Sequence, residues 1–243
     1  MTTFHDASWT QIQALRASLD ETTQAASSLQ EAAQHLAVML ATTFESCVLA
    51  RVFALVPLHQ LPAHERLWAE SFAGSMQLGG LVKDQTPVMT LLGTAGVEIA
   101  WSERTSSQGH RAIPLVDSMF IERAPMIAAL LDSLQIGPEL LHHTGDMNIR
   151  TFAGGLNARF FVDDAKTSLN AAGKHVIASR PFVEKYGVKS VFGMGGSYVT
   201  GTTVFAVVFT NETLTATEVD RFTSFIGTFK LATTANVEQG QLF

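Results

Sequence analysis

The segment GGSYVTGTT, at 195–203, comes closest to a nucleotide-binding signature in this chain. Gly196 and Gly201 are spaced as in the phosphate-binding pattern G-x-x-x-x-G-K-[ST], but Thr202 stands where that pattern has its lysine. A phosphate-binding loop also needs a strand before it and a helix after it, so that backbone N–H groups converge on the anion. Here the β-branched and aromatic run VFAVVF follows instead. The segment therefore predicts an antiparallel hairpin with glycines in its turn, and neither tight binding nor hydrolysis of ATP or GTP.

Two histidine-containing segments resemble parts of metal sites, but both patterns are incomplete. HERLW begins like the zinc motif H-E-x-x-H, yet Trp68 replaces the second imidazole, so His64 is expected to be solvated. His142, His143 and Asp146 are close in sequence, but adjacent side chains diverge and no third histidine has ligand spacing. This second segment is more typical of a polar loop, and no metal site is predicted.

Two aspartates and the single cysteine also have plainer explanations than catalysis. Asp163 and Asp164 end an expected strand and point to opposite faces, so they suit a turn better than an acid–base pair. Cys47 falls in an apolar segment, where a thiol is usually a small buried hydrophobic group. No serine lies in a G-x-S-x-G elbow. We therefore predict no catalytic residues.

GHRAIPL, at 109–115, is the segment of the middle region that most suggests a ligand-binding role. Its imidazole and guanidinium, His110 and Arg111, could face an anionic ligand. Equally, Arg111 could make a structural ion pair and His110 could satisfy a backbone carbonyl. Both interpretations stay open from the sequence alone.

The bulk composition limits the class of protein. A chain of 243 residues that is 47% hydrophobic can bury a full core, as one large domain or as one domain with an appended arm. Charged residues make up 16% and the net charge is -6 without a basic cluster, which argues against nucleic acid as a partner. Cys47 is the only cysteine, so no internal disulfide is possible. We find neither a signal-peptide pattern nor a run long enough to span a bilayer, and expect a cytoplasmic protein with no membrane partner.

The clearest periodicity lies near the N-terminus. Apolar and small residues recur at alternating steps of three and four from Ile12 to Thr43, with Asp6 or Ser8 available as a cap, and this predicts one long helix. The stripe repeats in heptads. It could pack along its own domain, or it could form the seam of a homodimer with a second copy of the chain.

The rest of the chain alternates between strand-like and helix-like segments. Strands are predicted at 46–58, 87–93, 157–165, 188–196 and 202–210. Helices are predicted at 62–76, 117–137 with a break at Pro125, 181–187 and 215–235. No internal repeat or low-complexity linker divides the chain.

The order of these elements resembles a known family. The segment from YGVKSVFGMGG to FIGTFKLA, at 186–232, is similar to the end of GAF domains, which have a strand, a glycine turn, an apolar strand and an acidic-capped helix. LLGTAG and GHRAIPL look like parts of the divergent GAF-like input regions found ahead of bacterial sensor kinases, and CVLARVFALV matches loosely. On this basis we divide the chain into a helical arm at 1–44, the candidate dimer seam, and a GAF-like sensory domain at 45–243.

The resemblance implies an α+β fold: a roughly six-stranded antiparallel sheet with helices on both faces and, in this chain, the long N-terminal helix. It also implies a small-molecule pocket between one sheet face and the helices of the middle region, with terminal helices on the opposite face, commonly as a dimer bundle. The ligand-binding candidates are His110, Arg111, Phe161, Tyr186, Phe192 and Met194.

The function implied is that of a sensory or regulatory module in signal transduction. It would bind an unidentified small molecule and signal through its terminal helices to a partner protein or an oligomer. The cofactor stays unknown, because the cyclic-nucleotide signature, a bilin-linking cysteine and the several cysteines of the methionine-sulfoxide-reducing GAF enzymes are not seen. The alternative is a small-molecule enzyme, hydrolase-like, that uses His110 with a carboxylate in the same pocket.

Overall fold

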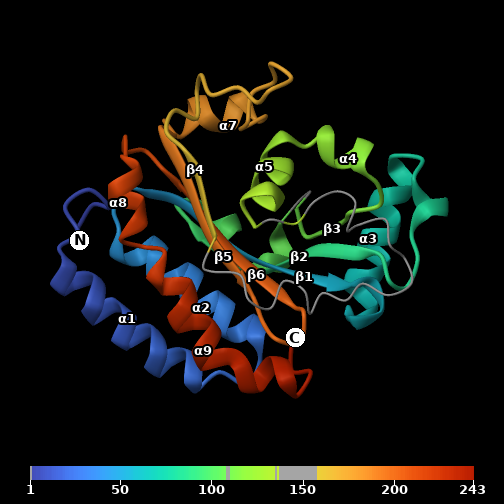
Figure 1. Ribbon diagram of the computed structural model, residues 1–243, viewed down its shortest axis with the longest axis horizontal. Helices are drawn as coiled ribbons and strands as arrows, with labels where there is room; N and C mark the ends of the chain where they lie inside the picture. Colours follow the sequence, from blue (N-terminus) through green and yellow to red (C-terminus); the bar gives the residue numbers. More distant parts are fainter. Residues whose placement is uncertain (1, 108–109, 135, 137–157) are drawn as a thin grey trace.

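The computed structural model describes residues 2–107, 110–134, 136 and 158–243 (Figure 1). Within them, the strands form a six-stranded antiparallel sheet in the order β3-β2-β1-β6-β5-β4, which confirms the α+β class. The long strand β1, Cys47–Pro57, lies near the middle and pairs with β2 on one side and β6 on the other. The pairing of β1 with β6 therefore joins the first three strands to the last three.

The predicted strand segments all contain strands. The other strands of the sheet are β2 (Pro87–Gly96), β3 (Ala112–Pro114), β4 (Ala158–Val162), β5 (Ser190–Ser197) and β6 (Thr203–Thr210). Only β3 was not predicted as a strand, because its three residues are too few to show a period of two. It pairs with β2 at the edge of the sheet.

The expectation of one long N-terminal helix is wrong. The chain forms two helices, α1 (Trp9–Gln24) and α2 (Leu29–Thr43), with a turn between them. Ser28 has extended backbone and its hydroxyl accepts a hydrogen bond from the Glu31 N–H, so it caps a second helix. The apolar spacing continues across the break, and for that reason the periodicity alone did not reveal it.

Helices α2 and α9 (Ser224–Glu238) lie against one face of the sheet, which we call the first face, and α1 packs on both of them (Figure 1). The large apolar residues Ile12, Leu19, Leu29, Leu36 and Leu40 of the predicted stripe are fully buried here, whereas Leu15 and Thr43 are partly buried and Thr22 is exposed. Their stripe is therefore covered by the chain's own sheet and helices, as in the first of the two interpretations. Homodimerisation through these helices stays a prediction, and it now depends on their outward-facing residues.

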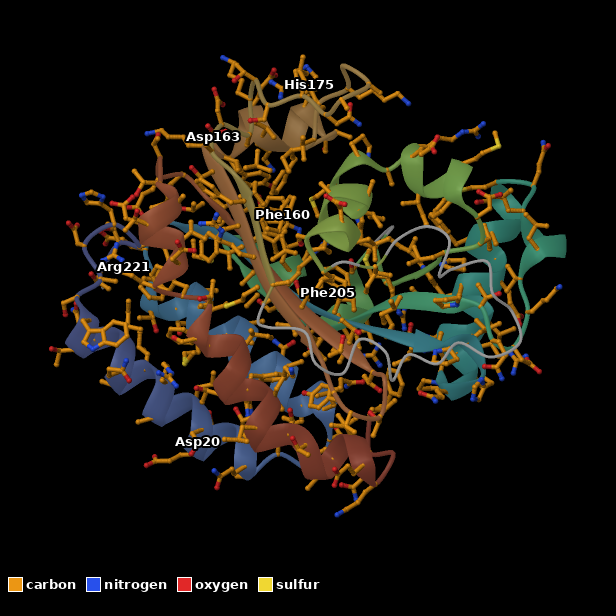
Figure 2. All side chains as sticks on the ribbon, viewed as in Figure 1. Asp20, Phe160, Asp163, His175, Phe205 and Arg221 are labelled. Carbon is orange, nitrogen blue, oxygen red and sulfur yellow. The ribbon has the colours of Figure 1, made fainter. Side chains whose placement is uncertain are left out.

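The opposite face of the sheet, which we call the second face, carries a separate core. Residues of α4 (Ser118–Glu122), α5 (Pro125–Ser133) and α7 (Arg180–Lys185) pack there with odd-numbered residues of β1 and β6, such as Phe53 and Phe205. The predicted break at Pro125 is confirmed, since α4 ends before it and α5 begins on it. Helix α3 (Ala63–Ser75) lies beside β3 at the sheet edge. Figure 2 shows Phe205 near the middle of the sheet and Phe160 on β4.

The segment GGSYVTGTT forms the predicted hairpin, but of its glycines only Gly201 lies in the turn, because Gly195 and Gly196 belong to β5. Strands β5 and β6 pair antiparallel, the Tyr198 N–H donates to the Thr202 carbonyl at 2.8 Å, and Gly201 has a φ of +97°. The helix predicted at 215–235 is instead two helices, α8 (Ala216–Asp220) and α9. None of the described helices is both long and apolar enough to cross a membrane.

Candidate functional site

Arg51 is a charged residue in the most central part of the sheet. Leu49 and Phe53 belong to the core of the second face and Ala50 and Val52 to that of the first, so alternation places Arg51 on the second face. Its side chain is largely covered, and this burial lowers the pKa of Arg51 to about 10. The guanidinium therefore stays charged at neutral pH, but it has lost much of its hydration.

The described part of the chain provides little compensation for this charge. Arg51 Nη2 donates a long hydrogen bond of 3.4 Å to Ser107 Oγ, and no described carboxylate forms an ion pair with it. The buried Nε has no hydrogen-bond partner within residues 2–107, 110–134, 136 and 158–243. A buried donor without a partner costs free energy, and native structures contain few of them.

Thr94 is the cross-strand neighbour of Arg51 on β2. Residues directly opposite in an antiparallel pair share a face, so both side chains project from the second face. The Thr94 hydroxyl is also buried without a hydrogen-bond partner in the described structure. Two adjacent side chains therefore present an unused donor and an unused hydroxyl at the same point on the sheet.

His110 completes this group, although its neighbours at 108–109 lie outside the described residues. The side chain reaches the surface, yet the surrounding protein and then the charge of Arg51 lower its pKa to about 4. The imidazole is therefore neutral at pH 7 and can donate one hydrogen bond and accept another. We call Arg51, Thr94, Ser107 and His110 the Arg51 cluster.

A second polar group lies beside this cluster, around Glu65 of α3. Glu65 is fully buried and accepts hydrogen bonds from Arg111 Nε at 3.1 Å and from Arg104 Nη1. The Arg111 guanidinium also lies against the His64 ring and 5.2 Å from the Trp68 ring centroid. Of the two interpretations of Arg111, the structural ion pair is the one observed. His64 stays mostly exposed, as expected.

A group of three aromatic side chains lies on the second face near the Arg51 cluster. The Trp101 and Tyr186 rings are 4.9 Å apart between centroids, and Phe182 packs on both. The Tyr186 hydroxyl donates to Glu98 Oε1 at 2.6 Å, and this bond is the main cause of a lowered pKa for Glu98. Tyr186 and Trp101 are only partly buried, so their edges are accessible beside the sheet.

The predicted ligand-binding residues do not come together. Phe192 and Met194 are buried in the core of the first face, where Phe192 packs against Phe4 and Phe222, and Phe161 packs at the margin of the same core. His110 and Tyr186 belong to the second face or its margin. The two sets are thus separated by the sheet.

The remaining candidates from the sequence are placed as follows. His142, His143 and Asp146 lie outside the described residues. Asp164 accepts hydrogen bonds from the Lys166 N–H and the Thr167 hydroxyl, which is a turn role. Among the described residues, no three histidine, cysteine, aspartate or glutamate side chains are grouped to hold a metal ion.

Sequence reasoning missed Arg51 and Thr94 as site residues. Arg51 lies within the apolar run VLARVFALVPL, from which only a strand was predicted. A charged residue within a strand that is otherwise apolar on both faces is itself a signal, because its side chain must project into a core. Thr94 carried no signal of its own, since its significance depends on the pairing of β1 with β2.

Comparison with protein-family models gives no match to this chain, and comparison with curated proteins gives no significant match either.

Proposed function

We propose that this chain is a GAF-like sensory or regulatory module that binds a small molecule on the second face of its sheet. The observation that carries the proposal is a pair of buried polar atoms, Arg51 Nε and Thr94 Oγ1, which have no hydrogen-bond partner among the described residues and lie at the centre of that face. Ligand sites are usually clefts lined by apolar and aromatic side chains with a few polar groups that fix orientation. The Arg51 cluster, beside the partly exposed Trp101 and Tyr186, has this composition.

The architecture gives further support. The GAF resemblance implies a six-stranded antiparallel sheet with its ligand on one face and terminal helices on the other, and the antiparallel six-stranded sheet agrees with this. The residues of α2 and α9 belong to the core of the first face, whereas Arg51 projects from the second. A ligand beside Arg51 would therefore act on the terminal helices through the sheet.

Thr94 offers a direct path for such an effect. Its side chain projects toward the Arg51 cluster, while its backbone N–H donates to Gln34 Oε1 at 3.0 Å and its carbonyl accepts from Gln34 Nε2 at 2.9 Å. Gln34 belongs to α2. A ligand that bonds the Thr94 hydroxyl and shifts this strand would thus move a residue to which α2 is doubly hydrogen-bonded. Output to a partner protein or a second copy of the chain would follow from a change in α2.

The hydrolase-like alternative has less support. It needs a carboxylate beside His110, and the charged group that faces His110 in the described structure is the cation Arg51. A general base works best with a pKa near the working pH, and the pKa of His110 is well below neutrality. We therefore favour binding over catalysis.

The test is a thermal-shift screen of metabolite-sized compounds, combined with native mass spectrometry of gently purified protein. We expect at least one retained or added compound to raise the unfolding midpoint, and expect Thr94→Val to weaken that effect. Lys230→Gln is the matched control, because Lys230 lies in a separate open groove beside Tyr198 and α9. The proposal would be contradicted if mass spectrometry found no bound compound and no compound raised the unfolding midpoint. It would also be contradicted if a compound stabilised the Thr94→Val and Arg51→Met variants as much as the wild type.

A further inference from the structure

The charges around the Arg51 cluster are not balanced in the described part of the chain. Arg104 and Arg111 both bond to the same carboxylate, that of Glu65. The segment at 104–107 contacts both Arg111 and Arg51. The Thr105 carbonyl accepts a hydrogen bond from Arg111 Nη1 at 3.4 Å, and Ser107 Oγ accepts one from Arg51. Arg104 and Arg111 thus share one carboxylate, whereas Arg51 has no ion pair among the described residues.

The burial of Arg51 makes this imbalance costly. A guanidinium that is removed from water loses solvation, and only a nearby anion or several hydrogen bonds restore it. His110 does not balance the positive charge of Arg51, because its imidazole is neutral at pH 7.

We infer that the ligand of the proposed site carries an oxyanion, a carboxylate or a phosphate group, which binds to Arg51 with the Thr94 and Ser107 hydroxyls beside it. This inference rests on the proposed function and specifies its ligand class. The guanidinium fork is suited to two oxygens of one oxyanion, and its unused Nε is one of the donors in that fork. The Thr94 hydroxyl supplies a further donor on the same face.

The groove beside Lys230 is also cationic, but it differs from the Arg51 cluster in its donor groups. Lys230 is half-buried and its pKa is lowered by desolvation, but the groove beside it is open and lined by the hairpin residues Ser197 and Thr200. An anion there would be held by one flexible ammonium group. Lys230→Gln is therefore a control for the loss of one positive charge without the loss of the fork.

The test compares anionic and neutral probes of the same shape at constant ionic strength. Benzoate and inorganic phosphate are the anionic probes, and benzamide is the neutral match for benzoate; any compound retained through purification is identified by mass and added to the set. Affinities are measured by calorimetry or thermal shift in the wild type, in Arg51→Met and in Lys230→Gln. Arg51→Lys, which keeps the charge but loses the fork, is the conservative variant.

We expect an acid to bind at least about tenfold more tightly to the wild type and to Lys230→Gln than to Arg51→Met, with Arg51→Lys in between, because charge-assisted hydrogen bonds are the strong ones. The ligand-free Arg51→Met protein should unfold at the same temperature as the wild type or a higher one. A marked fall in that temperature would assign Arg51 a structural role and overturn the inference.

Three further outcomes test the oxyanion inference and the proposed small-molecule binding on which it rests. If a neutral compound binds and Arg51→Met leaves its affinity unchanged, the chain binds a small molecule but the oxyanion class is wrong. If the anionic probes stabilise every variant alike, they bind as adventitious ions only and the inference is overturned. If no compound binds at all, both statements fail together.

Discussion

Glu65 of α3 and Arg111 next to β3 form a buried ion pair, with Arg111 Nε 3.1 Å from Glu65 Oε2. Both side chains are almost completely inaccessible to solvent. Arg104 bonds to the same carboxylate, so one glutamate joins the helix, the edge strand and the segment at 104–107. The pair therefore fixes the segment that carries Ser107 and leads to His110.

Glu65→Gln should destabilise the protein strongly, because two arginines lose their shared carboxylate. Removing one partner of a buried ion pair typically costs about 3–5 kcal/mol. Urea denaturation would measure the change in the free energy of unfolding. The matched control is Arg66→Gln on the same helix, whose ion pairs with Glu70 and Asp84 are at the surface, and which should change stability much less. Similar losses for the two variants would contradict the burial argument.

Gly93 of β2 is expected to tolerate no side chain. A Cβ at this position would lie 2.6 Å from the Gln34 backbone nitrogen and closer still to the Ala33 carbonyl of α2. Gly93→Ala must therefore push α2 away from the sheet, at a cost of about 1–3 kcal/mol or more. Gly80→Ala is the control, since nothing lies within 4 Å of a Cβ there. Equal unfolding midpoints for both variants would show that α2 adapts without strain.

Much of the fold could be predicted from the sequence because the signals were local. A run such as TVFAVVFT is apolar and β-branched, and the glycines of the hairpin stand between two such runs. Pro125 ends one helix and starts another by its own covalent geometry. The breaks at 25–28 and at 221–223 were missed because the apolar period continues across them.

The candidate site was harder to predict because it depends on register. Which face Phe192 or Met194 occupies changes with a shift of one residue, and both proved to lie with the terminal helices rather than beside His110. The pairing of Arg51 with Thr94 depends on the alignment of β1 and β2, which includes an irregularity between Val52 and Phe53. No local pattern in either strand specifies that alignment.

His110 should make the protein less stable in mild acid. Its pKa is lowered from 6.5 to about 4, so between these values the unfolded chain binds a proton that the folded chain does not. Stability contributed by the neutral imidazole is thus complete above about pH 6.5 and is lost as the pH falls toward 4. His110→Gln should reduce the loss of stability between pH 7 and pH 5, as measured by urea denaturation.

The control for this pH dependence is His175→Gln. His175 is exposed in the loop after β4, on the far side of the sheet from α9 (Figure 2). The variant should keep the pH dependence of the wild type. The explanation fails if His110→Gln also keeps it, and a direct titration of the His110 ring by NMR would then show whether its pKa is lowered at all.

Cys47 should be unreactive in the native protein. The thiol is buried at the start of β1, and desolvation raises its pKa to about 12. Because the thiolate is the reactive form, an aromatic disulfide reagent at pH 8 should label the folded chain only as fast as it opens. Labelling should become rapid in denaturant. Rapid labelling under native conditions would mean that the first strand is accessible, contrary to its burial.

The N-terminal helices offer the last prediction, which separates folding from association. Leu29 and Leu36 of α2 are fully buried in the core of the first face, so replacing either with alanine should cost about 2–5 kcal/mol. Replacing both with lysine would place two charges in that core, and we expect the chain to unfold rather than to yield a folded monomer.

Circular dichroism and light scattering of the Leu29→Lys, Leu36→Lys variant distinguish these outcomes, with the exposed Val38→Lys on the same helix as control. If the double variant is unfolded and the Val38→Lys protein is folded, the result agrees with burial of Leu29 and Leu36 within one chain. A folded monomeric double variant from a dimeric wild type would show that the stripe is a seam between two chains. The unfolding midpoint of the wild type should also be measured at several protein concentrations. A midpoint that rises with concentration would indicate a dimer coupled to folding. If α1 and α2 form that dimer, they must do so through their outward-facing residues.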